Sequence, residues 1–166
     1  MVTIGDSFSI VATLAGVALT IWSFMLVCAL LFPVRVEEAR QAVSGSLGKC
    51  FGAGLVAFMI GVIGFVVVQL PNPLLKLVGM LIMSGYLGCV MVGASGVAKL
   101  AAQRIQDLTN QQESQFASYG KASWYLVVAG LLPVLGWFLF APLMMVVGGG
   151  AGLKAALKSQ TVNEVA

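Results

Sequence analysis

The sequence predicts an all-α membrane protein with four transmembrane helices, a short interfacial helix after the first and a kinked fourth helix. Hydrophobic residues make up 60% of the 166 positions and charged residues only 9%, whereas soluble domains contain about 25% charged residues. The few charges are also gathered between long uncharged runs. A water-soluble fold could not cover its surface with so few ionic groups, so the surrounding solvent must be lipid.

A membrane-spanning helix needs roughly 20 consecutive apolar residues, and the sequence contains four such runs. We expect the spans at about residues 9–33, 50–70, 74–97 and 122–150. The strands of a transmembrane barrel would instead alternate apolar and polar residues over about ten positions. The chain is therefore predicted to form a single polytopic membrane domain over residues 1–166.

The first run is expected to end at Phe32-Pro33, because a proline disfavours helical geometry in the residue that precedes it. The stretch VRVEEARQAV follows at once and combines helix-forming residues with charges of both signs. This pattern indicates a short helix lying at the membrane interface. Ser44, Gly45 and Ser46 then interrupt the helix before the second run begins.

Only the short segment QLPNP at residues 69–73 joins the second and third runs, so their helices are expected to be antiparallel neighbours. Both runs carry small residues at helical spacing: Ala53, Ala57 and Gly61 on the second, and Gly85, Gly88, Cys89 and Gly93 on the third. Membrane helices associate by close backbone approach across such residues. We interpret the two sets as facing surfaces of one hairpin. The alternative is that one of them contacts another subunit.

The third helix is expected to extend past the membrane surface, because VAKLAAQRIQDL continues its helical spacing with charges on one side. The polar stretch TNQQESQFASYG, residues 109–120, follows. It is interpreted as a solvated connector, with a partner-binding loop as the alternative.

The fourth run, which includes LLPVLGWFLFAPLMMVVGGGAG, contains Pro133, Pro142 and the glycines Gly148, Gly149 and Gly150. Neighbouring helices can satisfy backbone groups freed by a proline within a membrane, so we expect a helix with a kink at one or both prolines. The glycines allow the helix to fray or a second backbone to approach closely. Broken helices also form transport sites, but the run lacks the convergent polar groups that such sites contain.

The sequence offers little catalytic chemistry. It contains no histidine, which removes the commonest zinc ligand and the usual general base. Every Asp and Glu lies outside the spans or at their edges, and Cys28, Cys50 and Cys89 have no metal-site spacing. Packing is the preferred role for these thiols, with palmitoylation of Cys50 as an alternative. No cofactor is predicted from the chain itself, lipid contacts are expected, and the protein is predicted not to be an enzyme.

The basic residues predict an orientation in the membrane. Six of them fall in the first and third loops: Arg35, Arg40, Lys49, Lys99, Arg104 and Lys121. The opposite side holds the other three: Lys76, Lys154 and Lys158. Because cytoplasmic loops are enriched in Lys and Arg, both termini are expected on the outer side. The net charge of +3 is attributed to lipid headgroup contacts and topology rather than to nucleic-acid binding.

Three stretches carry a resemblance: LFPVRVEEARQAV, GVIGFVVV and LLPVLGWFLFAPLMMVVGGGAGL. They are similar to small four-helix bacterial inner-membrane proteins that are associated with bactofilin (polymer-forming) domains. In that group a phenylalanine-proline pair ends a span and opens an interfacial helix, as Phe32-Pro33 would here. The fourth span often opens with a proline-containing pattern like that of residues 132–136. The resemblance implies a bacterial cytoplasmic (inner) membrane setting and a non-catalytic function.

Together these features favour a non-catalytic integral membrane subunit, whose small-residue helix faces pack against, assemble or anchor a larger bacterial membrane complex. Its expected partners are the lipid bilayer and other membrane subunits or further copies of itself. The alternative is a small transporter or channel-like homo-oligomer that uses the Pro/Gly-broken fourth helix. An enzymatic role would require a partner chain to supply the catalytic groups.

Overall fold

The computed structural model describes residues 4–109, 114–132, 134 and 136–163. Four helical stretches among them are long and apolar enough to cross a membrane, which confirms the predicted fold class: Phe8–Leu31, Leu47–Val68, Pro73–Thr109 and Gly136–Leu157. The elements are α1 (Ile4–Leu31), α2 (Pro33–Gly45), α3 (Leu47–Val68), α4 (Pro73–Thr109), α5 (Gln115–Leu131), the π-helix η1 (Gly136–Phe140) and α6 (Ala141–Asn163).

Helix α2 begins where the sequence predicts the end of the first span. Phe32 separates it from α1, and Pro33 occupies its first turn, where the missing backbone N–H of proline is not needed. The helix buries Val36, Ala39 and Val43. Ala39 packs against Gly96 of α4, so α2 is held against the bundle and does not lie on the membrane surface alone.

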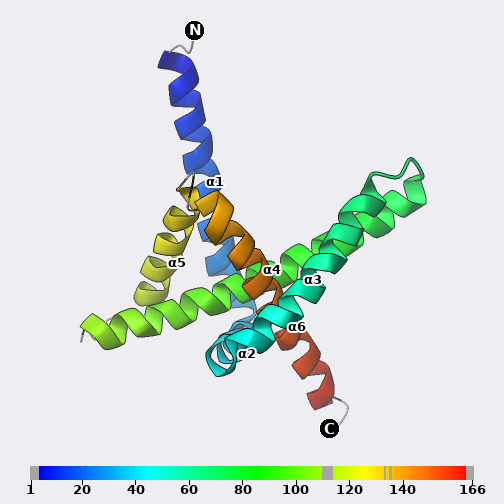
Figure 1. Cartoon of the computed structure of the whole chain (residues 1–166). Coiled ribbons are helices and arrows are strands. Elements are labelled where there is room, and N and C mark those ends of the chain that lie inside the picture. Colours follow the sequence, from blue (N-terminus) through cyan, green and yellow to red (C-terminus); the bar gives the residue numbers. More distant parts are fainter. Residues whose placement is uncertain (1–3, 110–113, 133, 135, 164–166) are drawn as a thin grey trace.

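Helices α3 and α4 form the predicted antiparallel hairpin and lie side by side along the green and cyan arm of Figure 1. Near the turn they pack closely across glycine. A Cβ atom on Gly79 would lie 2.8 Å from the backbone nitrogen of Val68, and one on Gly64 would lie 2.8 Å from the Ile82 side chain. Further from the turn, α6 crosses both helices (Figure 1).

The fourth apolar run differs from the predicted kinked helix over residues 122–150. Helix α5 ends at Leu131, and Leu132 is extended, with φ −60° and ψ 121°. Leu132 precedes a proline, which explains why it leaves the helical region. The chain then forms the wide π turn η1 and continues as α6. The run is therefore divided into two separate helices.

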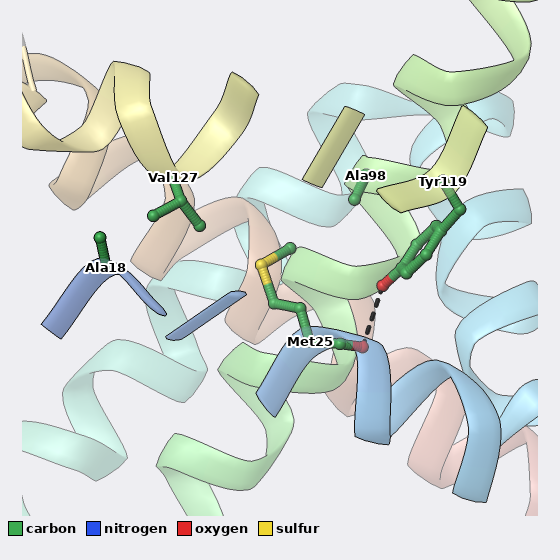
Figure 2. Packing of buried hydrophobic residues seen from close by; sticks show 5 residues of the cluster. All are labelled: Ala18, Met25, Ala98, Tyr119 and Val127. Atoms are coloured by element: carbon green, nitrogen blue, oxygen red, sulfur yellow. Dashed lines mark hydrogen bonds between the residues drawn. The ribbon is translucent and has the colours of Figure 1, made fainter. Parts of the chain in front are cut away.

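These two helices run in opposite directions. Tyr119, near the start of α5, donates a hydrogen bond to the Met25 carbonyl oxygen (3.0 Å), whereas Val127, further along α5, lies beside Ala18 (Figure 2). Helix α5 is thus antiparallel to α1. Helix α6 returns, because the guanidinium of Arg35, just after α1, donates to the Ala155 carbonyl oxygen (2.7 Å).

The return of α6 changes the placement of the C-terminal end. The first residues of α1 and the last residues of α6 lie at opposite ends of the molecule (Figure 1). That both termini lie on the outer side of the membrane stays a prediction, which treats the fourth run as one crossing. Lys154 consequently lies at the α2 end of the molecule, where its ammonium nitrogen is 3.7 Å from the Cys50 sulfur at the start of α3.

Candidate functional site

The centre of the molecule is a crossing at which α3 and α4 both meet α6 backbone to backbone. A Cβ atom on Gly93 of α4 would lie 1.8 Å from the carbonyl oxygen of Gly148. One on Gly54 of α3 would lie 1.9 Å from the carbonyl oxygen of Val146. Real Cβ atoms essentially never come closer than 3.0 Å, so the crossing requires glycine at these positions.

Several of the small residues singled out in the sequence are used inside the fold. A Cβ atom added to Gly61 would lie 2.8 Å from the ring of Tyr86, and Ala57 is buried beside the same ring. Ala53 is half-buried. Gly148, Gly149 and Gly150 are all buried within α6. These residues therefore hold the chain's own helices together.

Sequence reasoning missed one contributor to the crossing. A Cβ atom on Gly152 would lie 2.0 Å from the carbonyl oxygen of Cys89, and one on Gly150 would lie 2.0 Å from that of Cys50. The signal was present, because Gly148 and Gly152 are four residues apart and share one helix face. The sequence did not indicate which helices this face of α6 packs against.

Gly85 and Gly88 of α4 behave differently from Gly93. Both are exposed, and a Cβ atom on either would meet nothing within 4 Å among the described residues. They line an open groove of about 330 Å³ between α4, the start of α2 and the second half of α6. The half-buried Cys89 lies in the same wall, and Arg35 closes one end through its hydrogen bond to α6.

The residues predicted to kink the fourth span are only partly placed. Pro133 lies outside the described residues. Pro142 is the second residue of α6, directly after the π turn. In a regular α-helix its ring would crowd the carbonyl of Phe138, and the wider turn lies where that conflict would occur. Gly136, which opens the π turn, would place a Cβ atom 2.3 Å from the Gly130 carbonyl oxygen.

An apolar cavity of about 300 Å³ lies beside this break. Helices α1, α4, α5 and α6 all contribute to its walls, and Met25, Val127 and Trp137 are among the side chains that line it. Trp22 of α1 also packs against α5. It stacks edge-on against Trp124 with ring centroids 5.8 Å apart and donates a hydrogen bond to the Gly120 carbonyl oxygen (3.1 Å).

A charged cluster lies where α2 meets α4. The carboxylate of Glu37 accepts hydrogen bonds from the guanidinium of Arg40, one of them at 2.7 Å, and forms an ion pair with the Lys99 ammonium at 2.7 Å. The hydrogen bond from Arg40, followed by that from Lys99, lowers the pKa of Glu37 to about 2 from its ordinary 4.5, although partial burial acts in the opposite direction. Two cations thus share one carboxylate, which leaves the cluster positive.

The described residues include no group of three or more His, Cys, Asp or Glu side chains that could hold a metal ion. Cys28, Cys50 and Cys89 are free thiols. Cys50 is fully buried and its thiol donates to the Ala42 carbonyl oxygen (3.0 Å). This placement favours the packing role over palmitoylation.

Searches with protein-family models and against curated proteins and solved structures found no match to the chain. The resemblance to bactofilin-associated membrane proteins therefore stays a prediction. The described residues support a multi-pass membrane protein with an open small-residue groove, an apolar cavity and a charged cluster of Glu37, Arg40 and Lys99.

Proposed function

We propose that this protein is a non-catalytic integral membrane subunit that assembles with a larger membrane complex by receiving a partner helix in the Gly85–Gly88 groove. The observation that carries the proposal is the contrast along α4. The backbone of α6 packs directly against Gly93. Gly85 and Gly88 are equally small, but no described residue packs against them. A stripe of this kind is a surface on which a second helix can approach closely.

Exposed small residues matter for helix association because the surrounding solvent is lipid. Lipid chains are as apolar as a leucine side chain, so membrane helices gain little from burying apolar area and associate through close packing at small residues. The groove walls are largely apolar, and its one charged side chain, Arg35, is already bonded to α6. An apolar helix with its own small or medium side chains fits this surface.

Native mass spectrometry after gentle extraction from the source membrane tests the proposal. The wild-type chain should leave the membrane at fixed stoichiometry within a larger assembly, and Gly88→Leu should release it. Gly16→Leu is the matched control, because Gly16 is also exposed on a spanning helix with nothing within 4 Å of an added Cβ. A wild-type chain that emerges alone, or a Gly88→Leu chain that stays in the assembly, would contradict the proposal.

The proposed setting is a bacterial cytoplasmic membrane with the α2 end of the molecule in the cytoplasm. Of the nine Lys and Arg residues, only Lys76 lies at the α3–α4 turn. At the opposite end, Arg35 and Arg40 lie on α2, Lys99 pairs with Glu37 of α2, and Lys154 lies beside Cys50 at the start of α3. Lys154 therefore lies with the larger group of basic residues, whereas the sequence alone assigned it to the opposite side. In this proposal the positive-inside rule puts the C-terminal end of α6 in the cytoplasm and the N-terminal end of α1 outside. The arrangement requires α5, which is antiparallel to α1, to cross the membrane in addition to the four candidate spans.

A second candidate function is supported by the break between α5 and α6, which lies beside the apolar cavity of about 300 Å³. A small transporter of apolar compounds would use this broken segment. Its test is flux of an apolar fluorescent substrate in proteoliposomes, compared between wild type and Pro142→Ala. Flux that disappears in the variant supports transport, and equal leakage with empty liposomes contradicts it.

A further inference from the structure

A third pocket, distinct from the groove and from the apolar cavity, lies beside the charged cluster of Glu37, Arg40 and Lys99. It has a volume of about 290 Å³ and is enclosed by the last turn of α1, the first turn of α2, the second half of α4 and the start of α5. Leu30 and Phe116 contribute apolar walls, and Lys99, Gln103 and Gln106 contribute polar ones. The pocket is therefore amphipathic.

The sequence around this pocket changes from apolar to charged, as expected for helices at a membrane interface. Its apolar wall comes from the last residues of a spanning helix, at Ala29 and Leu30. Its polar wall comes from the part of α4 whose charges continue beyond the apolar run, around Lys99 and Gln103. A molecule bound here would have one part among hydrocarbon chains and another among polar groups.

The electrostatics of the polar wall favour an anion. Lys99 shares the carboxylate of Glu37 with Arg40 (2.7 Å to each cation), so the three groups together carry one excess positive charge. Gln103 is fixed in the same cluster, since its side-chain oxygen accepts a hydrogen bond from Arg40 (2.7 Å). Gln106 is held in turn by donating to the Ser118 hydroxyl (2.7 Å). The polar wall is thus positioned before any ligand arrives.

The start of α5 adds to the positive electrostatic potential in the pocket. Gln115 and Phe116, the first two residues of that helix, both line the pocket. The amino end of a helix carries the positive end of its dipole. It lies here on the same pocket as the ammonium group of Lys99.

We propose that this pocket binds the phosphate-bearing headgroup of an anionic phospholipid from the surrounding leaflet. Lys99 supplies the opposite charge, the glutamine amides supply hydrogen bonds to the headgroup, and Leu30 and Phe116 contact the upper part of the acyl chains. The amphipathic walls select a lipid over a free phosphate compound, because a free phosphate would leave the apolar half of the pocket unused. The proposal does not depend on the subunit role, since it concerns the isolated chain in its membrane.

Native mass spectrometry of the purified, delipidated protein titrated with dioleoyl phosphatidylglycerol or dioleoyl phosphatidylcholine tests this site. We expect one phosphatidylglycerol to bind at least about tenfold more tightly than phosphatidylcholine. Lys99→Gln should remove this preference, and Lys99→Arg should retain it. Lys76→Gln is the matched control, because it removes the same charge from the same helix at the opposite end of the molecule. It should bind phosphatidylglycerol as the wild type does.

Two further measurements separate the site from a folding defect and from a soluble ligand. Ala29→Phe narrows the pocket without changing any charge and should also lower phosphatidylglycerol affinity, with unchanged gel-filtration behaviour of the protein. Glycerol 3-phosphate at millimolar concentration should not displace the lipid. Equal affinity for the two lipids in the wild type, full binding by Lys99→Gln, or displacement by glycerol 3-phosphate would each overturn the proposal.

Discussion

Replacing Gly93 with alanine tests the central crossing directly. The added methyl group would lie 1.8 Å from the Gly148 carbonyl oxygen, where real Cβ atoms keep at least 3.0 Å. Both groups belong to helix backbones, so neither can rotate away, and α4 and α6 must separate by roughly 1 Å or more. The same separation would loosen the contact between Gly152 and the Cys89 carbonyl, which lies on the same pair of helices.

The expected magnitude follows from two opposing effects. Overpacking costs about 1–3 kcal/mol, and the upper value applies here because the clash joins two backbones. Alanine also gains about 1 kcal/mol of helix propensity over glycine. The net loss in the free energy of unfolding is therefore about 2 kcal/mol for Gly93→Ala. Gly88→Ala on the same helix meets nothing within 4 Å and should gain up to about 1 kcal/mol.

Unfolding in mixed micelles by titration with SDS, followed by tryptophan fluorescence, measures both variants. The signal is suitable because the Trp22 and Trp124 rings are only 5.8 Å apart and join α1 to α5. The two alanine variants should differ by about 3 kcal/mol, the range that overpacking and propensity allow together. Unfolding free energies within about 0.5 kcal/mol of each other, the size of an ordinary surface substitution effect, would refute the crossing of α4 and α6 at Gly93.

Three other predictions follow from contacts between helices. Because the folded state lowers the pKa of Glu37 from 4.5 to about 2, its stabilising contribution is complete above pH 4.5 and is lost as the pH falls toward 2; Glu37→Gln should remove that part of the pH dependence in the same SDS titration. Tyr119→Phe deletes the hydrogen bond to the Met25 carbonyl and should cost about 0.6–1.7 kcal/mol, so an unchanged unfolding midpoint would contradict that contact. Topology reporters placed after α2 and after α6 should give the same cytoplasmic signal, and opposite signals would contradict the return of α6.

Much of the helix arrangement follows from local sequence signals. Pro33 ended the first helix because it restricts the residue before it, and the structure separates α1 from α2 at Phe32. The segment at residues 69–73 was too short for anything but a turn, and α3 and α4 form the hairpin that it requires. The long uncharged runs likewise located the apolar helices, since the need for apolar length is a property of the bilayer alone.

The division of the fourth run and the position of α6 could not be predicted in this way. A turn that lies among apolar neighbours needs no charged residue to mark it, so residues 122–150 were indistinguishable from one long kinked span. The small-residue faces of α3 and α4 also fit one another as well as they fit α6. Which pairing wins depends on contacts that join Gly54 to Val146 and Gly93 to Gly148, and these are remote in the chain.

The position of α6 has a consequence for how the protein is made. The ribosome completes α3 and α4 before α6, so the hairpin enters the membrane while the backbone at Gly54 and Gly93 still lacks the helix that covers it. The crossing closes only when α6, which is synthesised after α3 and α4, packs against them. Until then, a nascent chain exposes glycine-rich faces that a partner or chaperone could bind.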